Sequence, residues 1–420
     1  MKHKAERVRR ADSMAGEASG AAVQCEPSLV IASIHREEGI TGVHTHIRQF
    51  RQYLDKVKVD APLVTSFSWN RTLTYPVFGL RRAIRPCSKA ASVLWFRHWH
   101  EVFLYHALRR RLAKLNECII YAHEPLAAHA ALRARRGPHQ RVILAIHYSI
   151  STSEEWVVTE GIKRDGAVFR GIREAEREVI PRVDGIVYVS RWARDALLGW
   201  LPEAAAVSSE VIFNFVAPLR CAPSMPEATG DLVTVGNLVH VKNHSYLLDV
   251  LAETKKSGQV LTLDIFGEGP LRSNLERKIS SLGLDDQVRL RGFRSDVRAL
   301  LPGYRAYVHG SYSEALPLAI IEAMAAGLPV VAGNFGPIPE LFDHGVEGRY
   351  WPLDDPVRAA AEVMDLLDSE PERLQAARSA TERFHRDFDA DKVAARLFHF
   401  VMGTTTPPRS DQAATKPLSL

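Results

Sequence analysis

The sequence SYSEALPLAIIEAM at residues 311–324 places two glutamates, Glu314 and Glu322, on either side of a proline. A short apolar run precedes it, so the segment is predicted to leave a strand and enter a helix near Ala315. Pro317 has the fixed backbone angle that suits a first helical turn. Apolar neighbours put Glu322 on a largely buried helix, which weakens the alternative that both glutamates are solvated surface acids.

The N-terminus of this predicted helix is a candidate ligand site. Free N–H groups and the positive end of the helix dipole favour a diphosphate. Two turns into the helix, Glu322 is placed to accept hydrogen bonds from a neutral diol such as a ribose. A carboxylate beside a diphosphate would repel it, so Glu314 is assigned to sugar hydroxyls instead.

Around this segment, short β-branched runs alternate with helical patterns, which is typical of parallel sheets. The predicted strands are 29–34, 118–122, 142–146 and 185–190 in the first half, and 232–235, 261–266, 288–290, 306–309 and 330–332 in the second. A stretch rich in proline and small residues, 217–230, divides two doubly wound domains, 28–216 and 231–391. Residues 1–27 are interpreted as a disordered leader and 403–420 as a loose tail.

Composition agrees with two globular α/β domains. The chain has 420 residues, of which 46% are hydrophobic and 25% charged. The four cysteines, Cys25, Cys87, Cys118 and Cys221, are widely spaced, which argues against a disulfide framework or a zinc site and favours a reducing cytoplasm. No uninterrupted apolar run is long enough to predict a membrane-spanning helix.

Beyond these patterns, residues 313–348, SEALPLAIIEAMAAGLPVVAGNFGPIPELFDHGVEG, resemble the E-x(7)-E region of family 4 glycosyltransferases, which have the GT-B fold. Further matches follow in the family order: VGNLVHVKNH (235–244), FGEGPLRSNLE (266–276) and RLRGFRSDV (289–297) in the second half, and EGITGVHTHI (38–47), YAHEP (121–125), AIHYS (145–149) and VYVS (187–190) in the first. The resemblance implies two Rossmann-like domains with the site in the cleft between them. It also implies that the segment 392–402 returns to pack on the first domain.

In the second domain the resemblance implies a donor site. Lys242 is expected to reach the donor diphosphate, and Glu314 joins it among the catalytic residues. Leu316, Leu318 and Glu322 are assigned to donor binding. Asn237 is assigned there too, although the family commonly has an arginine at this position. The sequence FGEGP lacks the third glycine of a dinucleotide fingerprint, where Arg272 stands, so Gly267 is interpreted as a tight turn beside the nucleobase.

In the first domain the resemblance places His123, of the HEP motif, beside the donor sugar as the candidate catalytic residue. His147 and Gly39 are assigned to the acceptor side, and for His147 a structural role at the strand end stays open. Gly42 lies on the loop after the first strand, where the lack of a Cβ lets backbone N–H groups approach a phosphate.

No metal or other cofactor is expected. The sequence DFDAD at 387–391 contains a D-x-D pattern that binds metal in another glycosyltransferase fold, but it follows Phe384, His385 and Arg386 rather than an apolar strand. It is therefore interpreted as negative charge at a helix N-terminus.

Positive charge is concentrated in one segment. Residues 81–114 hold nine lysine or arginine residues against one acid, a local charge of +8 in a chain with a net charge of +5. Trp95, Phe96, Trp99, Phe103 and Tyr105 are interleaved with them. This composition favours contact with anionic lipid at the inner membrane face. The alternative is an ordinary solvated helix face over a core, and no nucleic-acid motif accompanies the patch.

The resemblance implies a retaining glycosyltransferase that moves a sugar from a nucleotide-diphosphate sugar to a saccharide or lipid-linked acceptor. Members of the family commonly build cell-surface polysaccharide, lipopolysaccharide or glycolipid. Two alternatives stay open: a GT-B sugar-nucleotide epimerase, and a nucleotide-sugar-binding scaffold without turnover, to which Asn237 is the one pointer.

Overall fold

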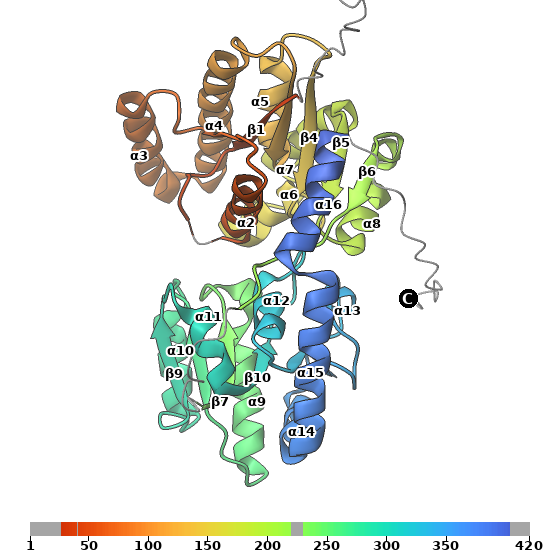
Figure 1. Cartoon of the computed structure of the whole chain (residues 1–420). Helices are drawn as coiled ribbons and strands as arrows, with labels where there is room; N and C mark the ends of the chain where they lie inside the picture. Colours follow the sequence, from red (N-terminus) through yellow and green to blue (C-terminus); the bar gives the residue numbers. More distant parts are fainter. Residues whose placement is uncertain (1–26, 40, 220–229, 404–420) are drawn as a thin grey trace, which may run out of the picture.

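The computed structural model describes residues 27–39, 41–219 and 230–403. Within these residues, twelve strands form two six-stranded sheets, one in each half of the chain, and all their pairings are parallel. Helices cover both faces of each sheet, and the two domains form two lobes (Figure 1). The predicted doubly wound architecture is confirmed.

The first sheet has the order β2-β1-β3-β4-β5-β6. Its strands are β1 (Ser28–Ser33), β2 (Leu63–Thr65), β3 (Cys118–His123), β4 (Gln140–Ile146), β5 (Gly185–Tyr188) and β6 (Ser209–Val211). Its helices are α2 (Gly42–Lys56), α3 (Arg71–Cys87), α4 (Lys89–Leu112), α5 (Pro125–Ala134), α6 (Thr152–Glu160), α7 (Ala167–Val179) and α8 (Arg191–Trp200). Successive side chains of β1 enter opposite cores: Val30 packs with α4 and α5, while Ile31 packs with α2. Burial on both faces explains the continuous apolar runs of this sheet.

The second sheet has the order β12-β11-β10-β7-β8-β9. Its strands are β7 (Gly230–Val235), β8 (Leu263–Phe266), β9 (Val288–Gly292), β10 (Tyr304–His309), β11 (Val330–Gly333) and β12 (Gly348–Trp351). Its helices are α9 (His244–Lys256), α10 (Arg272–Ser281), α11 (Val297–Leu300), α12 (Leu318–Ala325), α13 (Ile338–Leu341), α14 (Pro356–Asp368) and α15 (Glu370–Asp387).

The last described helix, α16 (Ala390–Met402), lies against the first domain although α15 belongs to the second. Its Leu397 and Val401 are fully buried in the core that contains α2 and β1. The chain therefore crosses between the domains twice, once before β7 and once between α15 and α16. Most of the predicted linker, and almost all of the predicted leader and tail, fall outside the described residues.

Three strands were missing from the sequence prediction: β2, β6 and β12. Each lies at an edge of its sheet. Two of them have only three residues, and in β12 (GRYW) only the first and last residues are buried. An edge strand is covered less completely than a central one, so it lacks the continuous apolar run on which the prediction relied.

The predicted helix start near Ala315 was wrong by three residues. The helix α12 begins at Leu318, and Pro317 precedes its first turn in an extended conformation. Proline disfavours helical geometry in the residue before it, and the carbonyl oxygens of Ala315 and Leu316 bind side chains of the first domain instead of starting a helix. Glu314 therefore lies in a loop, and Glu322 is just over one turn into the helix rather than two.

The basic segment forms the end of α3 and all of α4, two helices packed side by side at the outer edge of the first domain (Figure 1). Its aromatic side chains do not form an open surface. Phe103 is buried, Trp95, Phe96, Trp99 and Tyr105 are partly buried, and the Trp95 indole donates a hydrogen bond to the Val77 carbonyl of α3 (2.9 Å). In this respect the structure agrees with the core interpretation of the aromatic residues.

No helix among the described residues is both long and apolar enough to span a bilayer. Two of the four cysteines are described, and both are free thiols: Cys87 is exposed and Cys118 is buried.

Candidate functional site

Glu314 lies just beyond the end of β10, where two basic side chains meet its carboxylate. Lys242 Nζ is 2.6 Å from Glu314 Oε1, and His309 Nε2, at the end of β10, is 3.2 Å from the same oxygen. Burial alone would raise the pKa of Glu314, but Lys242 and His309 outweigh it and hold the pKa well below its usual range. Glu314 is therefore a fixed carboxylate whose charge is compensated before any ligand arrives.

Glu322 has a different environment on α12. Its carboxylate forms no hydrogen bond within the described residues, and its ion-pair partner, Arg298 Nε of α11, is 3.8 Å away. Burial raises the pKa of Glu322, and the opposing charges of Arg298 and Arg48 reduce but do not cancel that shift. This carboxyl group has its hydrogen-bonding capacity open for a ligand hydroxyl.

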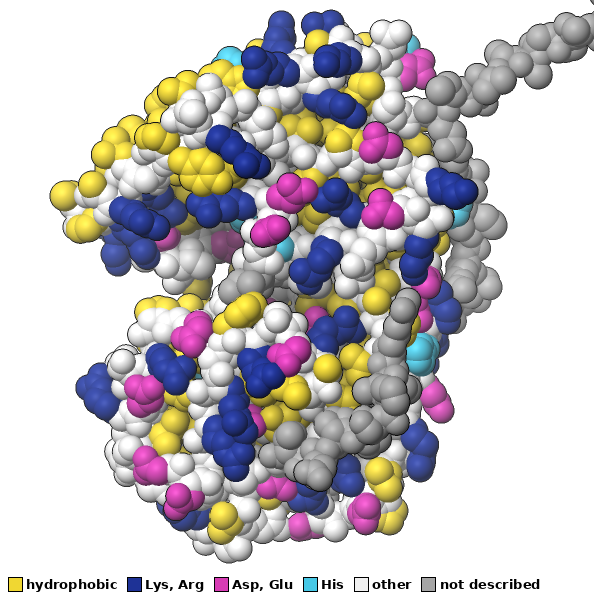
Figure 2. Space-filling view, turned by 60° about the vertical axis from the view of Figure 1, so that its left-hand side comes forward, with side chains coloured by type: hydrophobic (Ala, Val, Ile, Leu, Met, Phe, Trp, Pro, Cys, Tyr) yellow, Lys and Arg dark blue, Asp and Glu magenta, His cyan; other side chains and the backbone are white. Residues whose placement is uncertain are grey.

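The first turns of two helices face each other where the domains meet. Gly42 begins α2 in the first domain and Leu318 begins α12 in the second. A Cβ on Gly42 would lie 3.5 Å from Cδ1 of Leu318. Neither N-terminus has a side-chain cap, so two sets of free N–H groups and two positive dipole ends converge. Such an arrangement suits a phosphate group, and a deep notch separates the lobes (Figure 2).

Three histidines of the first domain gather at the same end of its sheet: His46 of α2, His123 at the end of β3 and His147 after β4. His123 Nδ1 is 2.9 Å from His147 Nε2, and the centroids of the His46 and His147 rings are 4.7 Å apart. Burial lowers the pKa of all three, that of His46 to about 4, so the imidazoles are neutral at neutral pH. The other nitrogen of His123, Nε2, is buried and has no hydrogen-bond partner among the described residues.

A hydrogen-bonded chain runs from these histidines to the second domain. The Asn214 amide N–H donates a hydrogen bond to the Leu316 carbonyl (2.9 Å). The amide oxygen, 3.2 Å from His46 Nδ1, therefore accepts a hydrogen bond from the N–H of that ring. Tyr121 then donates to His46 Nε2 (3.2 Å). Ser190 donates to the Ala315 carbonyl (2.7 Å). The loop that carries Glu314 is thus held by first-domain side chains.

Glu124, next to His123, has a positive φ of 79°, which is uncommon for a residue other than glycine. Its carboxylate is 2.8 Å from His35 Nε2. Burial lowers the pKa of His35, but the nearby Glu124 carboxylate outweighs this and raises it overall. The strained backbone turns Glu124 toward His35 at the carboxyl edge of the first sheet.

The glycine of the FGEGP turn has a steric role. Gly267 has a φ of 146°, and a Cβ there would lie 2.0 Å from the Gly236 carbonyl oxygen. The turn therefore packs against the loop that carries Asn237, whose side chain is exposed. Gly39 is also tightly packed, because a Cβ would lie 2.3 Å from the His44 ring.

Sequence reasoning assigned no role to several residues of this site, namely His46, Asn214, Ser190, Arg298 and His309. His309 ends a predicted strand, as His123 does, and that position was an available signal. His46 and Ser190 lie inside two of the quoted motifs. Nothing in the sequence marks Asn214 or Arg298, because their partners are distant in the chain.

The D-x-D pattern lies at a helix end, as expected. Asp389 caps α16 by accepting a hydrogen bond from the Asp391 N–H (3.0 Å), while Asp387 pairs with Arg383 and Arg386. Within the described residues no group of three potential metal ligands is brought together.

Comparison with known proteins identifies the second half of the chain. The family model for glycosyl transferases group 1 matches residues 222–383. The second domain is a group 1 glycosyl transferase domain. A curated relative, the putative colanic acid biosynthesis glycosyltransferase WcaL of Salmonella typhimurium, is 27% identical over 254 residues, which are 55% of this chain and 62% of the relative. For the next two relatives the match spans 46% and 41% of their lengths.

Solved structures show the fold of the chain as a whole. Sucrose-phosphate synthase from Thermosynechococcus elongatus superimposes with a TM-score of 0.69 at 17% identity, covering 90% of this chain and 100% of that one. Anabaena HepE in complex with UDP-glucose superimposes with a TM-score of 0.67 at 18% identity, covering 89% and 99%. The predicted GT-B fold is confirmed.

Proposed function

We propose that this chain is a retaining glycosyltransferase that transfers a sugar from a nucleotide-diphosphate sugar to a saccharide or lipid-linked acceptor. The observation that carries the proposal is the pairing of Glu314 with Lys242 and His309 beside the uncapped start of α12, which faces Gly42 of the first domain. The curated relatives support a role in polysaccharide assembly. HepE, crystallised with UDP-glucose, makes a UDP-sugar the first donor to test.

In this proposal the donor diphosphate lies between the first turns of α2 and α12, and Lys242 turns from Glu314 toward it. Glu314 then accepts hydrogen bonds from the sugar, and Glu322 from the ribose. His123, as a neutral imidazole, uses its unpartnered Nε2 for a sugar hydroxyl. His123 is fully buried in this structure, so the donor reaches it only when the domains separate or a loop moves.

The chemical step requires no carboxylate nucleophile. The bond between the anomeric carbon and the phosphate oxygen breaks, and its electron pair goes to the phosphate, which the helix ends and Lys242 stabilise. The acceptor hydroxyl attacks the oxocarbenium-like sugar from the same face, and its proton passes to the leaving phosphate. We propose that no divalent metal takes part, because the protein supplies the positive charge.

The proposed setting is the inner membrane face, through α3 and α4. Four large apolar side chains of these helices are about half exposed: Leu73 (50%), Tyr75 (48%), Leu80 (50%) and Leu94 (53%). Exposed Arg71, Arg82 and Lys89 lie on the same helices, and yellow and dark blue side chains stand side by side on the outer part of the upper lobe (Figure 2). Apolar contact combined with positive charge is the pattern of attachment to anionic lipid.

The deciding experiment measures nucleotide release from a UDP-sugar with and without saccharide acceptors, and analyses the anomeric configuration of the product. A transferase releases nucleotide faster with an acceptor and forms a glycoside. An epimerase releases nucleotide and an epimer without any acceptor, and a scaffold binds the donor without turnover. Either of the last two results would overturn the proposal.

A further inference from the structure

A cavity separate from the Glu314 cluster opens at the carboxyl edge of the first sheet. It has a volume of about 160 Å³, which is room for a small ligand such as one sugar ring rather than a single water. Its walls come from the ends of β1 and β3 and from α4 and α6. Six residues define its chemistry: His35, Phe96, Arg97, Glu124, Glu155 and Trp156.

Arg97 is the unusual member of this cavity. Within the part of the chain that the structure describes, its guanidinium makes no hydrogen bond and no ion pair, although it is mostly buried. A guanidinium has five N–H donors in a planar fork that matches a carboxylate or phosphate. A charged group without a partner inside a protein is energetically costly. A guanidinium that lines a cavity without a partner therefore indicates a site for an anionic ligand group.

The carboxylates that influence Arg97 are each engaged elsewhere. Glu124 pairs with His35 at 2.8 Å, and Glu176 accepts hydrogen bonds from the Thr152 backbone and hydroxyl at 2.9 and 2.8 Å. Glu101 pairs with Arg133 and His129. None of them is within ion-pair distance of Arg97, so its charge is available to something that enters the cavity.

The rest of the wall suits a sugar. Phe96 and Trp156 provide aromatic surface, with their ring centroids 5.3 Å apart, and ligand pockets combine such apolar walls with a few fixed polar groups. Glu155 also lines the cavity, and its side chain is exposed to solvent. Its carboxylate adds a hydrogen-bond acceptor for sugar hydroxyls to this wall.

We infer that this cavity binds the sugar unit of the acceptor, and that this unit carries a carboxylate or phosphate that pairs with Arg97. The inference rests on the proposed transferase function. Glu124 lines the cavity, and it directly follows His123, the residue proposed to contact the donor sugar. An acceptor sugar in the cavity therefore lies near the proposed donor sugar. An acidic group on Arg97 then fixes the orientation of the ring, and with it the hydroxyl offered to the donor.

The test is saturation-transfer NMR on the full chain with saturating UDP. The probes are methyl glucuronide, glucose 6-phosphate and methyl glucoside. We expect at least one charged probe to bind about tenfold more tightly than the neutral one, as a charge-assisted pair provides. If methyl glucuronide binds more tightly than glucose 6-phosphate, the acidic group is a carboxylate, and the reverse order indicates a phosphate. Arg97→Gln should abolish the preference, Arg97→Lys should retain part of it, and Arg109→Gln, an exposed arginine on the same helix, should leave it intact.

Equal binding of all three probes by the unmodified chain would overturn the inference, and so would a preference that survives Arg97→Gln. If Arg97 only balances the buried Glu176, Arg97→Gln will lower the melting temperature without changing the preference. UDP affinity is measured in the same samples. If the unmodified chain does not bind UDP, the result counts against the proposed function. If it binds UDP but shows no preference among the three probes, the result counts against this inference alone.

Discussion

Lys242 and Glu314, 72 residues apart in the sequence, meet as an ion pair with 2.6 Å between Nζ and Oε1. The pair joins the loop before α9 to the loop after β10, and it keeps a nearly buried carboxylate ionised. A lysine that neutralises a carboxylate without a ligand is able to exchange it for a phosphate when the donor binds. The two glutamates around α12 therefore differ: Glu314 has a close basic partner, whereas the ion-pair partner of Glu322 is 3.8 Å away.

Glu314→Gln and Glu322→Gln should separate sugar binding from nucleotide binding. Glu314→Gln should leave UDP affinity nearly unchanged and reduce transfer by roughly 100-fold, since it removes a fixed charge at the reacting centre. Glu322→Gln should weaken the binding of UDP itself, because the ribose is the proposed partner of Glu322. Calorimetry with UDP and with UDP-glucose measures both. Unchanged donor binding and unchanged transfer in both variants would falsify these assignments.

Transfer should not depend on a divalent metal. The expected positive charge at the leaving phosphate comes from Lys242 and two helix ends, so activity should survive excess chelator. The matching variant is Lys242→Met, which should reduce transfer strongly whether or not chelator is present. A complete loss with chelator that added metal restores would show that the phosphate site has been misinterpreted.

Stability should fall as the pH drops from about 6.5 toward about 4. Burial lowers the pKa of His46 from 6.5 to about 4. Between these pH values His46 is therefore protonated in the unfolded chain and neutral in the folded chain. The free energy of unfolding therefore decreases with falling pH, by up to roughly 1.4 kcal/mol per pH unit for one such histidine. His123 and His147, whose pKa values are also lowered by burial, add to the slope.

Urea denaturation between pH 4 and 7 measures this slope. His46→Gln should flatten it by about one proton. His98→Gln serves as the control, because His98 is an exposed histidine. An identical slope in the His46 variant would contradict the role of burial.

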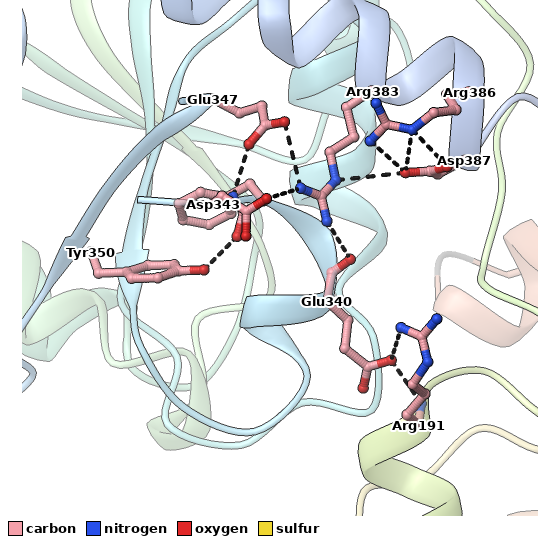
Figure 3. A network of polar contacts seen from close by, with 9 residues as sticks. Arg191, Glu340, Asp343, Glu347, Tyr350, Arg383, Arg386 and Asp387 are labelled. Atoms are coloured by element: carbon pink, nitrogen blue, oxygen red, sulfur yellow. Dashed lines mark hydrogen bonds and ion pairs between the residues drawn. The ribbon is translucent and has the colours of Figure 1, made fainter. Parts of the chain in front are cut away.

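Glu340 of the second domain caps a helix of the first (Figure 3). Its carboxylate accepts hydrogen bonds from the backbone N–H groups of Arg191 and Trp192 at the start of α8 (2.8 and 2.7 Å), and its own carbonyl is bound by Arg383 of α15 (3.1 Å). Glu340→Ala should therefore lower the free energy of unfolding by about 1–2 kcal/mol. Glu340→Gln, which keeps one acceptor oxygen, should cost less.

The matched control for Glu340 is Glu178→Ala on α7, which removes an exposed pair with Arg182 and should change stability by less than about 0.5 kcal/mol. Urea denaturation compares the three variants. Equal stability of Glu340→Ala and Glu178→Ala would mean that the contact between domains contributes nothing.

Vesicle binding should depend on the leucines of α3. Leu73→Ser with Leu80→Ser should reduce co-sedimentation with anionic vesicles, because these side chains are half exposed and provide the apolar contact. Arg82→Gln with Lys89→Gln should also weaken it, by about 1 kcal/mol per charge, and added salt should do the same. Arg109→Gln with Arg110→Gln is the control, since the two ends of α4 are about 35 Å apart. Equal partitioning onto neutral and anionic vesicles, or none, would contradict membrane attachment.

The sequence by itself determined the two α/β domains, and it predicted that Glu314 and Glu322 lie around the start of one helix. Continuous apolar runs mark the central strands because these are buried on both faces. The segment around Glu314 and Glu322 is recognisable because its pattern is a matter of short-range spacing. The strands β2, β6 and β12 were not predicted, because edge strands lack the continuous apolar run of the central strands.

Only the tertiary structure decided which side chains meet. The contacts of Glu314 with Lys242, of His46 with Asn214 and of Glu340 with α8 link residues far apart in the chain, and no local pattern encodes such a pairing. The start of α12 depended on the same cause, since first-domain side chains hold the carbonyls before Pro317. A local propensity is overridden when a distant partner supplies the hydrogen bonds that a helix would otherwise make.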